Sequence, residues 1–321
     1  PKLTSQTDLF LRAYSAQTIG ITGTKGKSTT TALACHLLAP FRPCISAGNM
    51  GIPLFDILDE ITPRTCLVCE FSAHQLEQAR TSPHIGVLLN LYEEHLDHYR
   101  SFVHYQHAKA NIAGDPAQDI VIFHDDDSLV RERIEERARA FQTKSENGNL
   151  FSYSLNHPVK KGLYATGNGI FDGETNQLVF SLEQPHPLVG RHNILNLMAA
   201  LLAAHAAGTD FDKLTSRIAS FTPLPHRLQY VGCIDERHYF NDSISTIPQA
   251  TVEAIRSVEE LPFVKGVDCL IVGGLDRGID YRPLADFFLR HPMESIAFVG
   301  EAGKRIHELL RQKNLVPAHS L

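Results

Sequence analysis

The sequence predicts an α/β protein built from a larger domain with a parallel sheet and a smaller α/β domain behind it. Short apolar strands alternate with amphipathic helices along most of the chain, which is typical of parallel sheets covered by helices. A glycine-rich turn joins the first expected strand, 17–22, to the first expected helix, 27–38. A length of 321 residues suits two domains, and the prolines at 223 and 225 mark a junction. We therefore expect domains at residues 1–222 and 223–321.

Each element follows from its local pattern. Apolar runs predict strands and amphipathic runs predict helices in the first unit, in the order strand 17–22, helix 27–38, strand 65–70, helix 73–79, strand 85–90, helix 101–112 and strand 119–124. Turn residues predict hairpins, or an excursion from the main sheet, over 150–182, and a leucine- and alanine-rich run predicts a helix over 193–207. The second unit is expected to be Rossmann-like, with strands 239–242, 269–272 and 295–299 and helices 247–257, 283–290 and 303–313.

Composition narrows the classes of function. The net charge is −6 and the pI about 6.3, so the chain lacks the basic surface that nucleic-acid binding needs. No apolar run of about 18 residues predicts a membrane span, and no signal peptide is visible. We expect a cytoplasmic monomer that binds neither nucleic acid nor membranes.

The cysteines favour a reducing compartment. Their spacing is not that of a disulfide framework in a chain of this length. Cys66 and Cys69 form a CxxC inside the apolar strand 65–70, and no second CxxC exists. A metal or redox role for this pair is the alternative, but the strand context favours small buried hydrophobic residues.

The strongest local motif is the glycine-rich turn, Gly20-Ile-Thr-Gly-Thr-Lys-Gly-Lys-Ser-Thr29. Glycines let backbone amides converge on phosphate, and the following helix N-terminus adds a favourable dipole. The motif departs from the general P-loop pattern, because Ile21 stands where glycine is usual and Gly23 lies three residues before Gly26. The expected nucleotide-binding residues here are Gly23, Thr24, Lys25, Gly26, Lys27, Ser28 and Thr29.

Polar side chains that could bind metal follow two further strands. Glu70 ends the strand 65–70, where a carboxylate could hold Mg²⁺ beside the phosphates, although alone it could be an ordinary helix N-terminal carboxylate. His95 lies among carboxylates in the segment 90–99, which could bind a second metal ion. Lys109, in the expected helix 101–112, would by itself be taken as a solvated lysine.

Nine segments occur in the order found in one family of ligases. They are GTKGKS at 23–28, GNMGIP at 48–53, EFSAHQLE at 70–77, NLYEEHLDHY at 90–99, HAKANI at 107–112, GRHNILN at 190–196, PHRLQ at 225–229, NDSIST at 241–246 and GGLDRGIDY at 273–281. Together they cover essentially the whole chain, which therefore resembles the Mur ligase family.

The resemblance implies specific roles. Lys27 would bind the ATP phosphates, with Ser28 and Glu70 on a first Mg²⁺. His95 would ligate a second Mg²⁺ with the help of Lys109, which in the family carries a carbamate. The other implied positions are Asn193 at the adenine, Arg227 and Asp242 on the nucleotide, and Asn49, Arg277 and Thr246 toward the substrates.

Two positions and the chain length depart from the family pattern. Ile244 stands where the family often has lysine, and Arg277 falls at or near the lysine that pairs with the incoming glutamate. Arginine keeps the charge and adds a bidentate fork for a carboxylate. The P-loop begins close to the first residue, so we expect the family's N-terminal UDP-binding domain to be absent and the C-terminal domain to be incomplete.

The activity implied by the resemblance is ATP-dependent ligation of D-glutamate to UDP-N-acetylmuramoyl-L-alanine through an acyl phosphate, in peptidoglycan precursor synthesis. Ile244 leaves open the same chemistry with L-glutamate, or with another amino acid or acceptor, as in other Mur or folylpolyglutamate-type ligases. The second alternative is an ATP-binding module without ligase activity. Four ionic positions, all retained in the motif set, argue against that module: Lys27, Glu70, His95 and Lys109.

Overall fold

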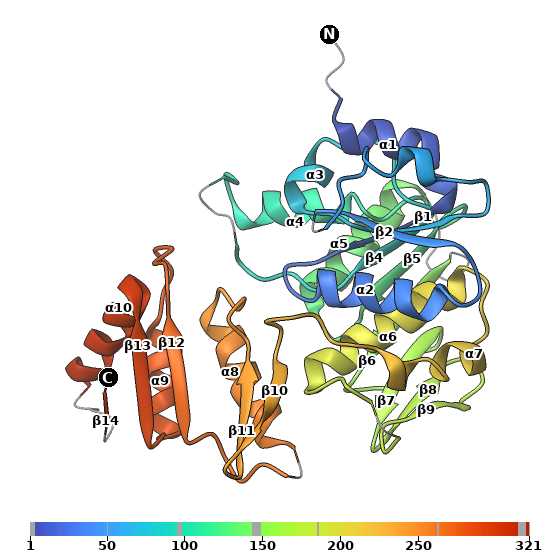
Figure 1. Cartoon of the computed structure of the whole chain (residues 1–321). Helices are drawn as coiled ribbons and strands as arrows, with labels where there is room; N and C mark the ends of the chain where they lie inside the picture. Colours follow the sequence, from blue (N-terminus) through green and yellow to red (C-terminus); the bar gives the residue numbers. More distant parts are fainter. Residues whose placement is uncertain are drawn as a thin grey trace. The chain divides into compact units, whose positions relative to one another are not determined.

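The computed structural model describes residues 4–49, 51–94, 98–142, 149–184, 186–261, 263–313 and 319–320. The chain divides into two compact units (Figure 1). Unit 1 comprises residues 1–187 and 193–222, and unit 2 comprises residues 188–192 and 223–321. No helix in the described ranges is long and apolar enough to cross a membrane.

Unit 1 is organised around a mostly parallel sheet. In the described residues its strand order is β2-β3-β1-β4-β5-β6-β7-β8-β9, with parallel pairing up to β7 and antiparallel pairing for the last two neighbours. The strands are β1 (Thr18–Thr22), β2 (Cys44–Gly48), β3 (Cys66–Glu70), β4 (Ile85–Leu88), β5 (Ile120–His124), β6 (Leu150–Ser154), β7 (Gly162–Thr166), β8 (Gly169–Asp172) and β9 (Leu178–Ser181). Because β1, β3, β4 and β5 are parallel neighbours, their carboxyl ends share one edge.

The helices of unit 1 connect these strands and begin at recognisable caps. Ser72 forms a capping box with Gln75, Ser101 accepts from the His104 amide, and Asp127 accepts from two amides of the next turn. The helices are α1 (Gln6–Tyr14), α2 (Lys27–Leu38), α3 (Ala73–Glu77), α4 (Phe102–Ala110), α5 (Ser128–Ala140), α6 (Arg191–Ala206) and α7 (Phe211–Thr215), with 3₁₀ turns at Ser15–Gln17, Leu58–Glu60 and Ile218–Ser220.

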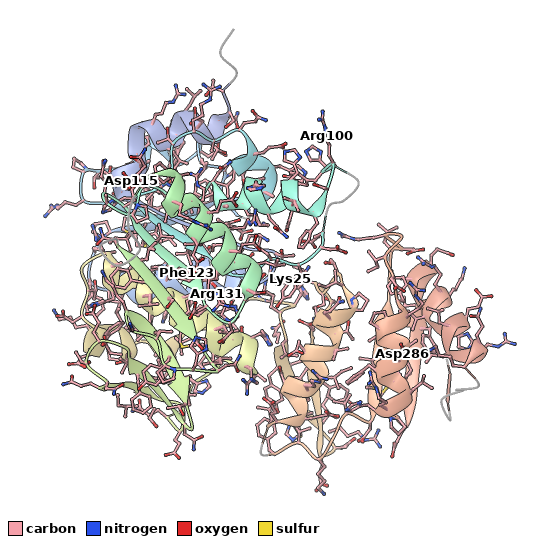
Figure 2. All side chains as sticks on the ribbon, turned by 180° about the vertical axis from the view of Figure 1, so that it is seen from behind. Lys25, Arg100, Asp115, Phe123, Arg131 and Asp286 are labelled. Atoms are coloured by element: carbon pink, nitrogen blue, oxygen red, sulfur yellow. The ribbon has the colours of Figure 1, made fainter. Side chains whose placement is uncertain are left out.

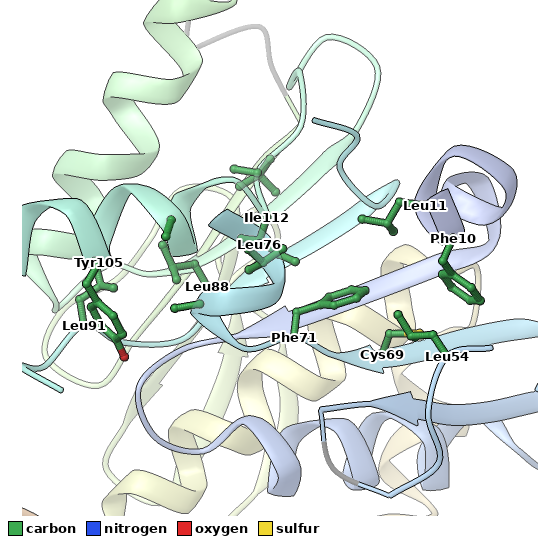
Figure 3. Close-up of a cluster of buried hydrophobic side chains, with 14 of the residues drawn as sticks. Phe10, Leu11, Leu54, Cys69, Phe71, Leu76, Leu88, Leu91, Tyr105 and Ile112 are labelled. Carbon is green, nitrogen blue, oxygen red and sulfur yellow. The ribbon is translucent and has the colours of Figure 1, made fainter. Parts of the chain in front are cut away.

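One buried cluster packs α1, α3 and α4 against the sheet (Figure 3). Phe10 of α1, Cys69 of β3, Leu76 of α3 and Tyr105 of α4 are each at most 2% exposed. This cluster fixes the helices that follow β3 and β4, and so the side chains those helices carry toward the carboxyl edge of the sheet.

The alternation of strands and helices predicted from the sequence is confirmed. The expected helix 27–38 has the same first and last residues as α2. The expected strands 17–22, 65–70 and 119–124 correspond to β1, β3 and β5, and each observed strand begins one residue later than expected. The prediction omitted α1, β2, α5, α7, β10 and β14. A signal for α5 was available, because Val130, Ile134 and Ala138 are buried at helical spacing. Edge strand β2 lacks a continuous buried run, so its pattern gave little signal.

The segment 150–182 does form hairpins, but it is no excursion from the main sheet. β6 pairs in parallel with β5 and β7 with β6, while β8 and β9 continue the same sheet. Gly162 adopts a φ of +132°, and a Cβ there would lie 1.9 Å from the Ser152 carbonyl oxygen. Glycine at this position therefore permits the close approach that joins β7 to β6.

Unit 2 contains two small sheets in its described part. The antiparallel hairpin of β10 (Gln229–Ile234) and β11 (Arg237–Asn241) is followed by the parallel strands β12 (Cys269–Gly273), β13 (Ser295–Val299) and β14 (His319–Ser320). The helices are α8 (Pro248–Glu259), α9 (Arg282–Arg290) and α10 (Gly300–Gln312). Ile255, Phe288, Ile296 and Ile306, each at most 3% exposed, tie these helices and β13 into one core. The strand-helix order of β12, α9, β13 and α10 confirms the expected α/β arrangement.

Candidate functional site

The glycine-rich turn lies between the end of β1 and the start of α2. Gly26 has a φ of +84°, and a Cβ at this position would lie 2.3 Å from the Asn196 side-chain oxygen. An L side chain would therefore be both strained and obstructed here. Because α2 starts directly after this glycine, its first backbone amides face the turn. The turn has the backbone and the helix N-terminus that phosphate binding requires.

Asn90, beyond the end of β4, holds the turn from the neighbouring strand. Its side-chain oxygen accepts from the Lys25 amide at 2.7 Å, and its side-chain nitrogen donates to the Lys25 carbonyl oxygen at 3.0 Å. Its own carbonyl oxygen accepts from the Thr24 amide at 3.0 Å. Sequence reasoning missed this role of Asn90, although its position at the end of an expected strand was an available signal.

Two lysines of the turn have different partners. The Lys27 Nζ donates to the carbonyl oxygens of Gly23 and Thr24, both at 3.1 Å, so it lies over the turn itself. The Lys25 Nζ forms an ion pair with Glu94 at 3.0 Å (Figure 2 labels Lys25). Lys27 is therefore already positioned over the turn that would enclose a phosphate.

Glu70 ends β3 beside the turn and is 2% exposed. Its Oε1 accepts from the Asn49 side-chain nitrogen at 3.0 Å, and its backbone oxygen accepts from the Asn49 amide at 2.8 Å. Its Oε2 is buried and has no hydrogen-bond partner among the described residues. A buried carboxylate oxygen without a partner is costly, and a hard cation would satisfy it.

Lys109 is buried, contrary to the solvated position that its helix pattern alone suggested. It is 2% exposed, and its Nζ donates to the Gly23 carbonyl oxygen at 2.8 Å and to the Thr22 hydroxyl at 3.4 Å. The Nζ also lies 4.9 Å from the centre of the Tyr105 ring. Burial, and then the nearby Lys27 cation, lower the pKa of Lys109 well below its usual range. Its position next to the P-loop therefore disfavours the charged form of Lys109.

Helix α6 contributes two asparagines to the same region. The Asn196 side-chain nitrogen donates to the Asn193 side-chain oxygen at 3.0 Å, and the Asn196 side-chain oxygen accepts from the Thr30 hydroxyl at 3.3 Å. Asn196 thus connects the expected adenine-contact residue to α2. Sequence reasoning missed Asn196 as well, although its spacing of three residues from Asn193 on a helix was a signal.

The remaining residues expected in unit 1 vary in how they are placed. Ser28 and Thr29 are buried in the first turn of α2. Asn49 is exposed apart from its contacts with Glu70. His95, expected to ligate a second metal ion, lies outside the described residues. Among the residues that are described, no three or more histidine, cysteine, aspartate or glutamate side chains form a group that could hold a metal ion.

Unit 2 brings Arg227 and Asp242 together. Asp242 follows β11 and accepts from the Leu228 amide at 2.8 Å and from the Ser245 hydroxyl. His226 and Leu228 have positive φ angles of 64° and 47°, so the backbone turns sharply on both sides of Arg227. Burial raises the pKa of Asp242, against the hydrogen bonds from Ser245 and Leu228. The two motifs that hold these residues are thus one local structure.

Three other residues singled out in unit 2 are placed as follows. Thr246 is half-buried just before α8. Ile244, where the family often has lysine, is 41% exposed. Arg277 is exposed in the turn after β12, beside Asp276, whose carboxylate accepts from Arg305 and from the Gly278 amide. That turn is held by Asp276, so Arg277 projects from an ordered loop.

The comparisons with known proteins agree with this geometry. Residues 21–204 match the Mur ligase middle domain. The chain is 35% identical over 297 residues to the UDP-N-acetylmuramoyl-L-alanine–L-glutamate ligase of Xanthomonas euvesicatoria pv. vesicatoria, covering 91% of this chain and 58% of the relative. It is 31% identical over 316 residues to the UDP-N-acetylmuramoylalanine–D-glutamate ligase of Geobacillus sp., covering 97% of this chain and 65% of the relative.

A solved structure shows the same fold. The MurF ligase of Thermotoga maritima in complex with ADP superposes with a TM-score of 0.67 at 18% identity, covering 94% of this chain and 70% of that one. At this identity the likeness concerns the fold alone. The present chain spans well under two thirds of the length of the Xanthomonas relative, 58%.

Proposed function

The chain belongs to the Mur ligase family, and from this premise we propose that it forms an amide bond between glutamate and UDP-N-acetylmuramoyl-L-alanine at the expense of ATP, yielding ADP and phosphate. One observation carries the proposal: the buried Lys109 amine donates to the carbonyl oxygen of Gly23 in the P-loop. A phosphate-binding turn alone would indicate only a nucleotide site. A buried lysine at that turn adds a group that simple nucleotide binding does not require.

Residues 1–222 would supply most of the ATP site. The amides of 23–28 and the N-terminus of α2 would bind the phosphates, and Lys27 would neutralise charge on the β- and γ-phosphates. The present contacts of Lys27 with two backbone carbonyls would be exchanged for phosphate oxygens. Asn193 would contact the adenine, and the complex of the MurF ligase of similar fold with ADP supports a nucleotide-binding role.

The residues present fit a magnesium ion. Glu70 offers a buried, unpartnered carboxylate oxygen, and Ser28 offers a hydroxyl at the start of α2. Magnesium commonly takes one or two protein ligands and fills the rest of its coordination with phosphate oxygens and water. Such an ion would neutralise phosphate charge during transfer. A second site would use His95 and Lys109.

We further propose that Lys109 carries a carbamate. The lowered pKa of Lys109 favours the neutral form of its amine, and a neutral amine can add to carbon dioxide, forming an N–C bond and releasing one proton. The product is an anion, so it would replace a buried amine beside Lys27 with a group of opposite charge. That change creates an attractive charge pair with Lys27 and supplies an oxygen ligand for the second magnesium ion.

The chemistry requires activation of a carboxylate, because an amine does not displace its oxygen at a useful rate. The γ-phosphoryl group would pass to the terminal carboxylate of the UDP-muramoyl substrate and give an acyl phosphate. The glutamate amine would then attack the acyl carbon, and the tetrahedral adduct would expel phosphate. Lys27 would stabilise charge on the transferring group, and the P-loop amides would orient it.

Residues 223–321 would complete the site. Arg227 and Asp242, already adjacent in unit 2, would contact the nucleotide. Arg277 would pair with a carboxylate of glutamate, and Thr246 would lie near the same substrate. Asn49 would approach the muramoyl substrate from the end of β2. We place the reaction in the cytoplasm, where ATP is available.

D-glutamate is the enantiomer expected from the sequence, and L-glutamate is a second candidate. The L-glutamate ligases among the relatives are 35–36% identical to this chain, and the D-glutamate ligases are 29–32% identical. The difference in identity favours L-glutamate, and Arg277 is compatible with either enantiomer because both carry the same carboxylates.

Phosphate release tests the proposal. Full-length protein would be given Mg-ATP, UDP-N-acetylmuramoyl-L-alanine and either D- or L-glutamate, with each component omitted in turn. Release that requires all three substrates and prefers one enantiomer is expected, and it also settles the amino acid. Binding of Mg-ATP without release in either mixture would refute the glutamate ligase and support a module that only binds nucleotide.

A further inference from the structure

Three consecutive aspartates, at positions 125–127, follow the end of β5. The first pairs with His157 at 2.8 Å and the second accepts from the Ser154 hydroxyl at 2.6 Å, so both face the end of β6. The third, Asp127, faces β4, which is the other neighbour of β5. Its Oδ2 accepts from the Leu91 amide at 3.0 Å. The loop after β5 therefore connects to the ends of both neighbouring strands.

Asp127 divides its two carboxylate oxygens between two tasks. Oδ1 accepts from the amides of Leu129 at 3.0 Å and Val130 at 3.2 Å, which caps the N-terminus of α5. Oδ2 is left for the Leu91 amide. A cap needs only one side-chain oxygen, and serine or asparagine would serve about as well as aspartate. The carboxylate therefore supplies a second acceptor that capping alone does not require.

Leu91 lies between two residues that hold the phosphate-binding turn. The carbonyl oxygen of Asn90 accepts from the Thr24 amide at 3.0 Å. The amide of Tyr92 donates to the Thr24 hydroxyl at 3.0 Å. The strand order β1-β4-β5 puts the turn after β1 on one side of this segment and the loop after β5 on the other. Residues 90–92 are therefore hydrogen-bonded on both sides, to the P-loop and to Asp127.

We propose that Asp127 is a positioning residue for ATP binding. It holds the Leu91 amide, and through it the flanking residues Asn90 and Tyr92, in the place from which they hold the P-loop turn. The inference rests on the ATP site of the proposed function. It extends that site to a residue that lies across the segment 90–92 from the turn.

Both ends of this hydrogen bond belong to well-packed parts of unit 1. Asp127 caps a helix whose residues Val130 and Ile134 are at most 1% exposed. Leu91 is 2% exposed and belongs to the same buried cluster as Tyr105 (Figure 3). The packing of α5 therefore fixes the carboxylate that holds the segment 90–92, and the position of α5 is passed on to the P-loop.

Loss of this contact has a specific kinetic consequence. If the turn has its binding shape in only a fraction of the molecules, the apparent Kd for ATP rises in inverse proportion to that fraction. Bound ATP selects the molecules with the binding shape, so kcat at saturating ATP stays unchanged. A purely structural role of Asp127 would lower the Tm and leave the Kd of the folded protein as it was.

Two substitutions separate the cap from the contact with Leu91. Asp127→Ser keeps a capping oxygen and removes the second acceptor, and Asp127→Asn keeps a capping oxygen and turns an N–H group toward the Leu91 amide. In full-length protein both should raise the calorimetric Kd for Mg-ATP by about 2- to 30-fold. The kcat for phosphate release should stay close to the wild-type value. Asp172→Ser is the control, because Asp172 also accepts from two amides but lies in a turn after β8.

Amide exchange tests the contact itself. In protein labelled with ¹⁵N-leucine, the amides of Leu91 and Leu129 report on the two oxygens of Asp127 separately. Each resonance is assigned by its absence from the spectrum of Leu91→Met or Leu129→Met. Exchange at Leu91 should become faster in Asp127→Asn, while Leu129 should keep its wild-type rate because the cap remains.

Three outcomes would overturn the inference. Equal Kd values for Mg-ATP in the wild type and in both Asp127 variants, measured where all are folded, would reduce the hydrogen bond to a structural contact. An equal rise of the Kd in Asp172→Ser would show that the effect is not specific to Asp127. Wild-type protein that binds no Mg-ATP would overturn the proposed nucleotide site together with this inference.

Discussion

The Lys109 Nζ lies 2.8 Å from the Gly23 carbonyl oxygen, with both groups buried at the end of β1. This contact joins α4 to the phosphate-binding turn across 86 positions of sequence. It places a lysine of lowered pKa beside Lys27, and so makes the chemical state of Lys109 a property of the site.

We expect Lys109→Ala to lower ligase turnover by about 10- to 100-fold, because the ion that depends on the carbamate would be held less well. Added acetate should restore part of the rate, since a small carboxylate can enter the space left by the side chain. The measurement is phosphate release with and without acetate. Lys304→Ala, an exposed lysine of α10, is the control and should behave as the wild type. Full turnover by Lys109→Ala without acetate would contradict the proposed carbamate.

Gly26→Ala should abolish Mg-ATP binding. The new methyl group would meet the Asn196 side-chain oxygen at 2.3 Å in a backbone region that costs about 1–2 kcal/mol for an L residue. Gly167→Ala is the matched control, because Gly167 also has a positive φ but has open space around a Cβ. Calorimetric titration with Mg-ATP and denaturant unfolding should show lost binding only for Gly26→Ala and some loss of stability for both. Equal ATP affinities in the two variants would show that the contact with Asn196 is unimportant.

Asn90→Ala should weaken ATP binding without unfolding the protein. The substitution removes the side-chain partner of the partly buried Lys25 amide and carbonyl, at a cost of up to about 1–3 kcal/mol for each lost hydrogen bond. The lost hydrogen bonds destabilise the P-loop conformation that binds ATP. Because 1.4 kcal/mol corresponds to a factor of ten, the Kd for ATP should rise by about tenfold or more. Asn168→Ala removes an exposed asparagine with a side-chain partner, Glu183, and serves as the control. Unchanged ATP affinity in Asn90→Ala would show that the turn keeps its shape without this residue.

Asp8 should contribute stability that is lost in acid. It is fully buried and accepts from the Arg80 and Thr81 amides and from the Thr4 hydroxyl. Burial by itself would raise the pKa of Asp8, but these hydrogen bonds and Arg12 lower it below its usual value. The folded state therefore binds the proton less well than the unfolded state. The contribution is complete above the unfolded pKa of about 3.9 and disappears as the pH falls through the lower folded value.

Denaturant titrations of wild type and Asp8→Ala at several pH values test this expectation. At neutral pH the variant should lose about 1–3 kcal/mol, because two amides lose their acceptor. The difference between the two proteins should shrink below about pH 4. The exposed Asp59→Ala provides the control and should show no such dependence. A difference that stays constant down to the acid transition would contradict the role given to the Asp8 charge.

Much of the fold could be predicted because strands and helices depend on nearby residues. The spacing of apolar side chains was enough for α2 and for β1, β3 and β5, and the glycine-rich turn is evident from its residue types alone. The prediction was weaker where pairing partners decide the outcome. β6 to β9 were expected as hairpins or an excursion, yet pairing of β6 with β5 makes them part of the main sheet.

The sequence by itself determined the strand-helix order, the P-loop and the set of ionic residues that point to an ATP-dependent ligase. Only the tertiary structure decided that Asn90 holds Lys25, that Asn196 meets Thr30, and that Lys109 is buried. Asn90 lies 65 positions from Lys25, and Asn196 lies 166 positions from Thr30. Lys109 lies 86 positions from Gly23, whose carbonyl oxygen accepts its hydrogen bond. A local pattern records which face of an element is apolar. Which distant side chain reaches that face depends on strand order and packing.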